Sequence, residues 1–147
     1  MVLGFSFTAG PEVKRIIAPK ALNRFKQRIR DITRRAKSVS IAATMDELAP
    51  FMPGWRAYFG YCETPDVLRY LTCWVRLRLR AALWRQWKTQ RRRRAALLAL
   101  GVHQRLASNT AGSSRGAWYL ARAKVLSVGL SNAHFKSLGL PSLIEPG

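Results

Sequence analysis

The chain has 147 residues, of which 48% are hydrophobic, so it can bury the core of one domain and general disorder is excluded. Its 26 Lys and Arg residues against seven Asp and Glu residues give a formal net charge of +19. Two cysteines argue against a disulfide framework and against a four-ligand zinc site, and no apolar run reaches the roughly 18 residues of a membrane span. Because the amino terminus lacks the pattern of a secretory signal, we expect a cytoplasmic protein.

The distribution of charge predicts a polyanionic partner. No acidic residue occurs between Val67 and Ile144, whereas Arg and Lys recur throughout that stretch. A compact chain with such an imbalance repels itself unless a polyanion offsets the repulsion. Nucleic acid is the commonest such partner, and an anionic membrane surface is the alternative.

The first 37 residues predict a hairpin followed by a helix. Residues 2–8 and 14–18 predict short strands, separated by an Ala-Gly-Pro turn at residues 9–11. Pro19 suits the first turn of a helix that we expect over residues 20–37. The apolar positions of this helix fall in one arc, and the rest of its circumference is cationic. These apolar positions are Leu22, Phe25, Ile29, Ile32 and Ala36.

Two further helices are expected over the next segment. Ser38 or Ser40 suits the N-cap of a short helix that ends at Ala49. Pro50 breaks this helix, and a new helix starts there. The spacing of Trp55, Tyr58, Phe59 and Cys62 is that of a core stripe on one helix face.

The longest predicted helix covers residues 66–88. Its apolar side chains occupy one arc, and Arg69, Arg76 and Arg80 form a row beside that arc. Arg78 and Arg85 project from nearly the opposite side, close to Trp74. The helix therefore predicts one buried face and guanidinium groups on at least two others.

The last third of the chain predicts shorter elements. A basic run at residues 91–94 leads into a short apolar helix over residues 95–100, which Gly101 ends. Residues 108–116 predict a loop, and a last helix is expected over residues 124–138. The predicted fold class is therefore all-α, a bundle of about five or six helices with a short N-terminal β-hairpin.

The residues do not form a complete active site. His103 and His134 have no nearby carboxylate and no metal-ligand spacing, and Asp46 and Glu47 diverge by about 100° on a helix. The chain has neither a phosphate-binding glycine loop nor a nucleophile elbow. We expect no catalytic residues, no metal and no cofactor, and a structural or surface role for the histidines.

The cationic residues predict an RNA-binding surface instead. Arginine predominates over lysine, and its planar guanidinium group binds phosphate through two hydrogen bonds and stacks on bases. We expect phosphate contacts from the first helix, the long helix and the basic run, with Trp84 and Trp87 as stacking partners, although packing explains the tryptophans equally well. The candidate RNA-binding residues are Lys20, Arg24, Arg28, Arg34, Arg35, Arg69, Arg76, Arg80, Trp84, Arg85, Trp87, Lys88, Arg91, Arg92, Arg93, Arg94 and Arg115.

Short motifs occur along nearly the whole chain. They are Leu3-Gly4-Phe5, Ala18-Pro19-Lys20, Gly54-Trp55-Arg56-Ala57-Tyr58-Phe59, Val75-Arg76-Leu77-Arg78-Leu79-Arg80, Leu83-Trp84-Arg85-Gln86-Trp87-Lys88, Leu130-Ser131-Asn132-Ala133-His134-Phe135 and Leu138-Gly139-Leu140-Pro141-Ser142-Leu143. Together they resemble the carboxy-terminal part of bacterial group II intron-encoded reverse transcriptase/maturases. The Gly-Trp-x-x-Tyr-Phe and Leu-Trp-x-Gln-Trp-Lys stretches are the most distinctive.

The resemblance implies a division of the chain and a function. Residues 1–18 would be the tail of a reverse transcriptase palm, and residues 19–145 the thumb, or maturase-specific (X) domain. Such a domain binds group II intron RNA, assists its folding and splicing, and supports reverse transcription during mobility. The implied partners are the intron RNA, a template–primer duplex and an upstream reverse transcriptase fragment, with no membrane.

The family's Tyr-Ala-Asp-Asp polymerase motif is absent, so polymerase activity is not carried over. The chain therefore fits a fragment, a split-off reading frame or a degenerate remnant. Two alternatives to the maturase function stay open: a generic basic DNA- or RNA-binding protein, and a non-functional remnant of an intron-encoded protein. A membrane binder fits poorly, because its apolar face is needed for the bundle.

Overall fold

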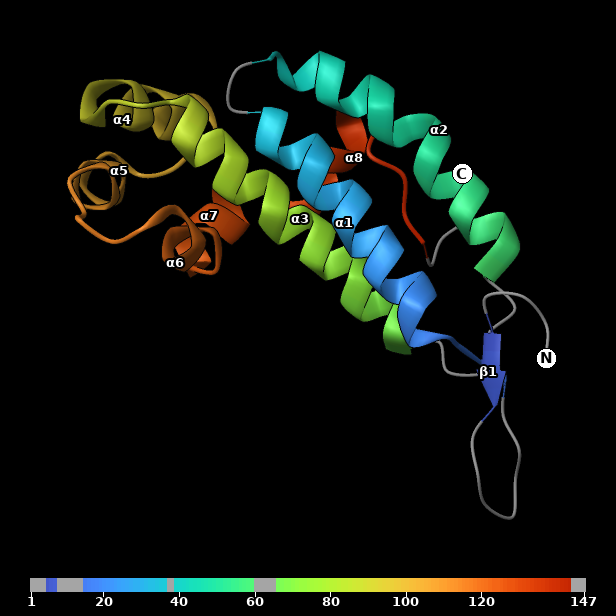
Figure 1. The fold of residues 1–147 in the computed structure, drawn as a ribbon. Helices are drawn as coiled ribbons and strands as arrows, with labels where there is room; N and C mark the ends of the chain where they lie inside the picture. Colours follow the sequence, from blue (N-terminus) through green and yellow to red (C-terminus); the bar gives the residue numbers. More distant parts are fainter. Residues whose placement is uncertain (1–4, 8–14, 37–38, 60–65, 144–147) are drawn as a thin grey trace.

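The computed structural model describes residues 5–7, 15–36, 39–59 and 66–143. Within these ranges two short strands precede eight helices, which confirms the all-α bundle with an N-terminal hairpin (Figure 1). The elements are β1 (Phe5–Phe7), β2 (Arg15–Ile17), α1 (Pro19–Arg35), α2 (Ile41–Phe59), α3 (Asp66–Gln86), α4 (Gln90–Ala99), α5 (Gln104–Ala111), α6 (Ala117–Ala121), α7 (Lys124–Gly129) and α8 (Asn132–Ser137).

The amino-terminal strands pair as predicted. β1 and β2 are antiparallel, with Phe5 opposite Ile17. The predicted turn at residues 9–11 lies outside the described residues. Pro19 opens α1 directly after β2, at a position where a helix needs no backbone N–H donor.

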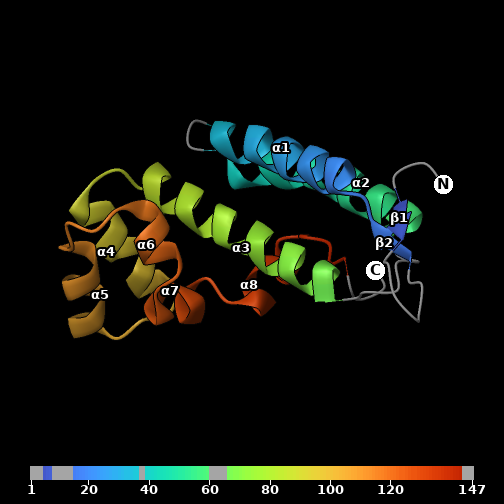
Figure 2. The same ribbon diagram turned by 60° about the horizontal axis from the view of Figure 1, so that its bottom comes forward.

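Three long helices form the larger part of the bundle. α1 and α3 run in the same direction, and α2 returns beside α1 (Figures 1 and 2). The predicted apolar arcs of α1 and α3 are buried, except for the partly buried Leu22, and they meet residues of α2 and the carboxy-terminal segment in one core. Fully buried members of this core include Ile29, Leu48, Leu71, Val75 and Phe135.

The predicted break at Pro50 is wrong. α2 begins after Ser40, whose Oγ accepts a hydrogen bond from Ala43 N at 3.2 Å, and continues through Pro50 and Pro53. Both prolines are exposed, so the carbonyls that lose a donor lie on the solvent side of the helix. Leu48 and Met52 bury the opposite side, and this packing holds the helix together across the prolines.

A second, smaller core lies at the far end of α3. Trp84 from α3 packs there with Leu97, Ala107, Leu120 and Leu126 from the four following helices. α3 contacts α6, and α4 contacts α5, at the end of the molecule opposite the hairpin (Figures 1 and 2). α3 is therefore the element that joins the two cores.

Several boundaries in the last third differ from the prediction. The basic run is helical, because Thr89 caps α4 by accepting a hydrogen bond from Arg92 N. The predicted loop over residues 108–116 is partly wrong, since α5 extends to Ala111, and α6 follows the loop. The predicted single helix over residues 124–138 divides into α7 and α8, because Leu130 leaves the helical conformation and Ser131 caps α8. Gly101 and Gly139 adopt positive φ angles at the predicted helix ends.

Candidate nucleic-acid interface

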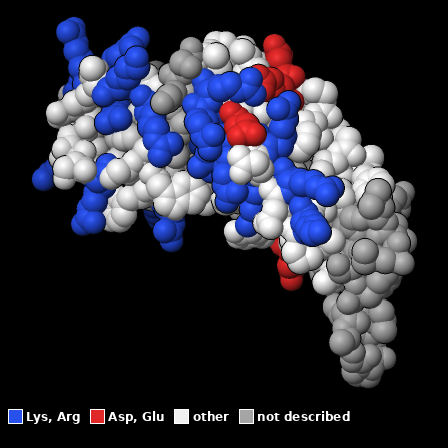
Figure 3. Space-filling view, viewed as in Figure 1, with Lys and Arg blue, Asp and Glu red and all other residues white. Residues whose placement is uncertain are grey.

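The outer face of α1 is cationic. Lys20, Arg24, Arg28 and Arg34 are exposed, as the helical pattern predicted. Figure 3 shows Lys and Arg side chains spread over the face that carries α1, α3 and α4, with Asp and Glu at only a few places. This face offers positive charge from several elements to one ligand.

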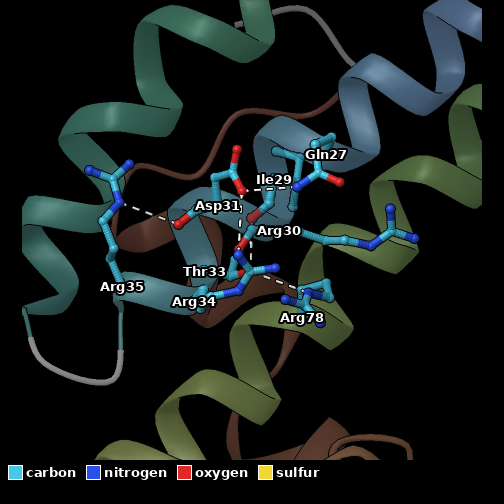
Figure 4. Close-up of polar contacts among 8 residues, drawn as sticks. All are labelled: Gln27, Ile29, Arg30, Asp31, Thr33, Arg34, Arg35 and Arg78. Carbon is cyan, nitrogen blue, oxygen red and sulfur yellow. Dashed lines mark hydrogen bonds and ion pairs between the residues drawn. The ribbon is translucent and has the colours of Figure 1, made fainter.

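Carboxylates offset part of this charge. Arg35 pairs with Glu47 at 2.8 Å, Arg34 lies 3.7 Å from Asp31, and Arg69 pairs with Asp66. All three pairs are solvent-exposed, so each contributes little to stability, and a phosphate can replace the carboxylate. Figure 4 shows the first two arginines beside Asp31 at the end of α1.

Four arginines converge where the second halves of α1 and α3 face each other. Arg30 and Arg34 from α1, and Arg78 and Arg85 from α3, line a cavity of about 330 Å³ with Thr33 and Ala82. Arg78 Nε donates a hydrogen bond to Thr33 Oγ1 at 3.2 Å (Figure 4). Burial lowers the pKa of Arg78, and repulsion from Arg85, Arg30 and Arg34 lowers it further. Arginine nevertheless stays protonated in proteins, so this cavity is positively charged.

The indole ring of Trp74 makes cation–π contacts with two of these arginines, Arg30 and Arg78. The Arg30 and Arg78 guanidinium carbons lie 5.5 and 6.0 Å from the ring centroid. Lys26 Nζ lies 5.6 Å from the same centroid and also donates a hydrogen bond to the Tyr70 hydroxyl at 3.2 Å. Cations within about 6 Å of an aromatic face are attracted to it. Trp74 therefore holds positive groups of both helices at their interface.

The prediction that Arg80 is an exposed phosphate ligand is wrong. Its side chain is only 6% exposed, because the segment between α7 and α8 covers it. Arg80 Nε donates to the Leu130 carbonyl at 2.8 Å, and Nη2 donates to Asn132 Oδ1 at 3.1 Å. Burial lowers the pKa of Arg80, and the charge of Arg76 adds to the effect. Arg80 thus fastens the carboxy-terminal helices to α3.

Trp84 is also wrongly predicted as a stacking partner for bases. It is 1% exposed and lies in the smaller core. Trp87 is partly buried and meets Trp84 edge to face, with 6.0 Å between ring centroids. The packing explanation, which the sequence left open, therefore accounts for Trp84 fully and for most of Trp87.

The run of four arginines in α4 divides into two pairs. Arg91 and Arg92 are exposed. Arg93 lies over the Trp84 ring at 4.7 Å and donates to the Trp84 carbonyl at 3.0 Å, and burial lowers its pKa. Arg94 donates to Ser108 Oγ at 2.8 Å and so connects α4 with α5. The first pair faces solvent, and the second mainly holds helices together.

The remaining candidates differ in exposure. Arg85 and Lys88 are exposed at the end of α3, where Lys88 turns the chain with a φ of 38°. Arg76 is partly buried, and its Nε has no hydrogen-bond partner among the described residues. Arg115 is exposed and lies 4.7 Å from the Tyr119 ring centroid, two residues before α6.

The sequence-based candidates omitted Lys26, Arg30 and Arg78, which the structure places around Trp74. A signal for all three was present, because Trp74 and Arg78 are four residues apart on one helix, as are Lys26 and Arg30. The contact between the two pairs depends on how α1 packs on α3, which periodicity in one helix does not reveal.

The described residues hold no group of three or more His, Cys, Asp and Glu side chains arranged as metal ligands. Among the same residues, no helix combines the length and hydrophobicity needed to cross a membrane.

The family follows from a direct comparison. Residues 22–98 match the family model of the group II intron, maturase-specific domain. The match covers more than half of the chain, from within α1 to within α4, and includes the cationic residues of these helices other than Lys20. The chain belongs to this maturase-specific domain family, which confirms the resemblance seen in the sequence. A search of curated proteins found no match to the chain.

Proposed function

We propose that this chain binds group II intron RNA through the cationic face of α1, α3 and α4, and thereby assists folding and splicing of the intron. The observation that carries the proposal is the convergence of arginines from α1 and α3 within the segment that matches the maturase-specific family. Group II intron RNA is the partner that fits both the family and a formal charge of +19.

The mechanism is charge neutralisation by a preformed surface. Compact intron RNA brings phosphates of different helices close together, and each arginine that binds a phosphate reduces their repulsion. The splicing chemistry belongs to the RNA and its magnesium ions, so the chain needs no catalytic residue. Arg28, Arg85, Arg91 and Arg92 are exposed on α1, α3 and α4 and can reach phosphates.

The domain division remains part of the proposal. Residues 1–18 are the tail of a reverse transcriptase palm, and residues 19–145 are the maturase domain. A template–primer duplex and an upstream reverse transcriptase fragment are the further partners in this arrangement.

The test is a comparison of affinities across a salt series. The chain is titrated with a group II intron RNA and with duplex DNA of equal phosphate number, at several NaCl concentrations. Binding of several phosphates predicts that log K falls with log salt by about 0.7–0.9 per contact, and the intron RNA should remain tighter at every salt. Equal affinity for the two nucleic acids at all salts would reduce the chain to a generic polycation.

Variants locate the binding face within the same experiment. Arg91→Gln/Arg92→Gln should weaken intron RNA binding and lower the salt slope by about 1.4–1.8, because two phosphate contacts are lost. The matched control is Arg105→Gln/Arg122→Gln, which removes the same charge from exposed residues of α5 and the end of α6. If both double variants lower the slope equally, the binding face is not the one proposed.

A further inference from the structure

The four arginines between α1 and α3 form a site with its own geometry. We call the space lined by Arg30, Thr33, Arg34, Arg78 and Arg85, together with Ala82, the arginine cavity. Its guanidinium groups come from two helices that lie side by side (Figures 1 and 4). An exposed arginine on one helix contacts a ligand from one side only. The arginines of this cavity can contact the same ligand from two helices.

Two of the four arginines, Arg30 and Arg78, are held in place before a ligand enters. Thr33 Oγ1 donates to the Ile29 carbonyl at 2.8 Å and accepts a hydrogen bond from Arg78 Nε, which anchors Arg78 against α1. The Trp74 ring holds the Arg30 and Arg78 guanidinium groups through cation–π contacts. Preorganised donors lose less conformational entropy on binding, so these two arginines favour a ligand more than mobile side chains would.

The charge within the cavity is only partly compensated. Asp31 is the one carboxylate that described contacts join to these arginines, and it lies 3.7 Å from Arg34 on an exposed side of α1. No acidic residue lines the cavity among the described residues. Four like charges repel one another, and an anion inside the cavity would relieve the repulsion that remains.

We propose that the arginine cavity binds a single phosphate group of RNA, held by guanidinium groups from both α1 and α3. The proposal rests on the RNA-binding function proposed above and identifies one recognition site within it. Guanidinium groups match the geometry of phosphate oxygens, because each can donate two parallel hydrogen bonds to them. Phosphates along a regular duplex are also contacted by exposed residues of α1 and α4, and the cavity takes one phosphate that projects from the RNA surface.

The first test uses inorganic pyrophosphate, without RNA and without divalent metal. The full chain is titrated by calorimetry in about 150 mM NaCl, an ionic strength that screens weak contacts between exposed charges. We expect one pyrophosphate per chain and a rise in melting temperature on binding. Arg30→Gln and Arg85→Gln should each weaken binding by about tenfold or more, because each removes a charge-assisted contact.

The matched control is Arg105→Gln, which removes one exposed arginine on α5 and should change pyrophosphate affinity less than twofold. Arg30→Gln can disturb the packing on Trp74, which would make its result ambiguous. Arg85 is exposed, so Arg85→Gln should leave the packing intact and still tests the proposal. Circular dichroism of each variant verifies the fold. Equal affinities of wild type, Arg85→Gln and Arg105→Gln would overturn the proposal.

The second test distinguishes the source of the phosphate and separates the two proposals. Intron RNA fragments with a 5′-phosphate and with a 5′-hydroxyl are compared for wild type and Arg85→Gln. An equal loss of affinity assigns the cavity to an internal phosphodiester, and a loss confined to the 5′-phosphate assigns it to a terminal group. If the chain binds intron RNA selectively but does not bind pyrophosphate, the proposal that the cavity binds a phosphate is overturned, and the proposed function is not. Pyrophosphate binding without preference for intron RNA would overturn the proposed function and the RNA assignment.

Discussion

Arg76 and Arg80 are one helical turn apart on α3, yet the structure gives them different surroundings. Arg80 is buried against Leu130 and Asn132, whereas Arg76 is only partly buried. On the helix alone the two positions look alike, because both lie beside the apolar arc. The difference arises from α7 and α8, which cover one of the two positions. Arg80 is therefore a structural residue in a row that the sequence pattern describes as a binding surface.

Replacing Arg80 tests this assignment. Arg80→Met leaves the buried Leu130 carbonyl without its donor and should lower the free energy of unfolding by about 1–3 kcal/mol. Urea denaturation measures the change. The exposed control Arg92→Met should stay within about 0.5 kcal/mol of wild type. An Arg80→Met chain of wild-type stability that binds RNA weakly would show that Arg80 is a ligand after all.

For single residues, the sequence predicted the charge and the helix face of a side chain but not how deeply that side chain is buried. Trp84 lies off the apolar arc of α3, which favoured exposure, and it is buried because α4 to α7 form a second core around it. Arg93 is partly buried for the same reason, since its guanidinium group covers the Trp84 ring. Neither contact is encoded by periodicity within α3 or α4 alone.

At the scale of elements, α2 has the most unexpected feature, a helix that continues through two prolines. Its apolar side packs on α1, where Phe25 lies 5.7 Å from Phe51 and 4.6 Å from Trp55 between ring centroids. This packing outweighs the backbone cost of the prolines. A propensity argument based on Pro50 alone predicts a break because it omits the tertiary contacts.

A proline replacement distinguishes a continuous helix from two helices. In a continuous α2, Pro50→Ala restores a hydrogen-bond donor and should raise the free energy of unfolding by up to about 3 kcal/mol. The matched control is Pro19→Ala at the first turn of α1, where proline costs nothing and the change should be small. Urea denaturation of the two variants gives both values. No gain from Pro50→Ala would indicate that a new helix starts at Pro50.

The long elements were predictable and the short ones were not. The apolar positions of α1 and α3 repeat over four or more turns, so their periodicity identified both helices and their buried faces. α6, α7 and α8 have only five or six residues each, too few for a periodic signal. Their ends depend on caps such as Ser131 and on packing against α3.

At the scale of the whole molecule, one helix connects fold and function. α3 contributes the core residues Leu71, Val75 and Leu79 to the larger core and Trp84 to the smaller one. It also carries Arg78 and Arg85 to the arginine cavity. The sequence predicted a cationic surface on α1 and α3, but the cavity required the packing of the two helices, which no single pattern contains.

We expect RNA to contact the cationic face of α1, α3 and α4 rather than any positive charge of the chain. Arginine modification by phenylglyoxal, read by mass spectrometry with and without group II intron RNA, tests it directly. RNA should protect Arg28, Arg85 and Arg91 from modification, while Arg105 and Arg122 on α5 and at the end of α6 remain reactive. Equal protection of all five arginines would contradict a defined binding face.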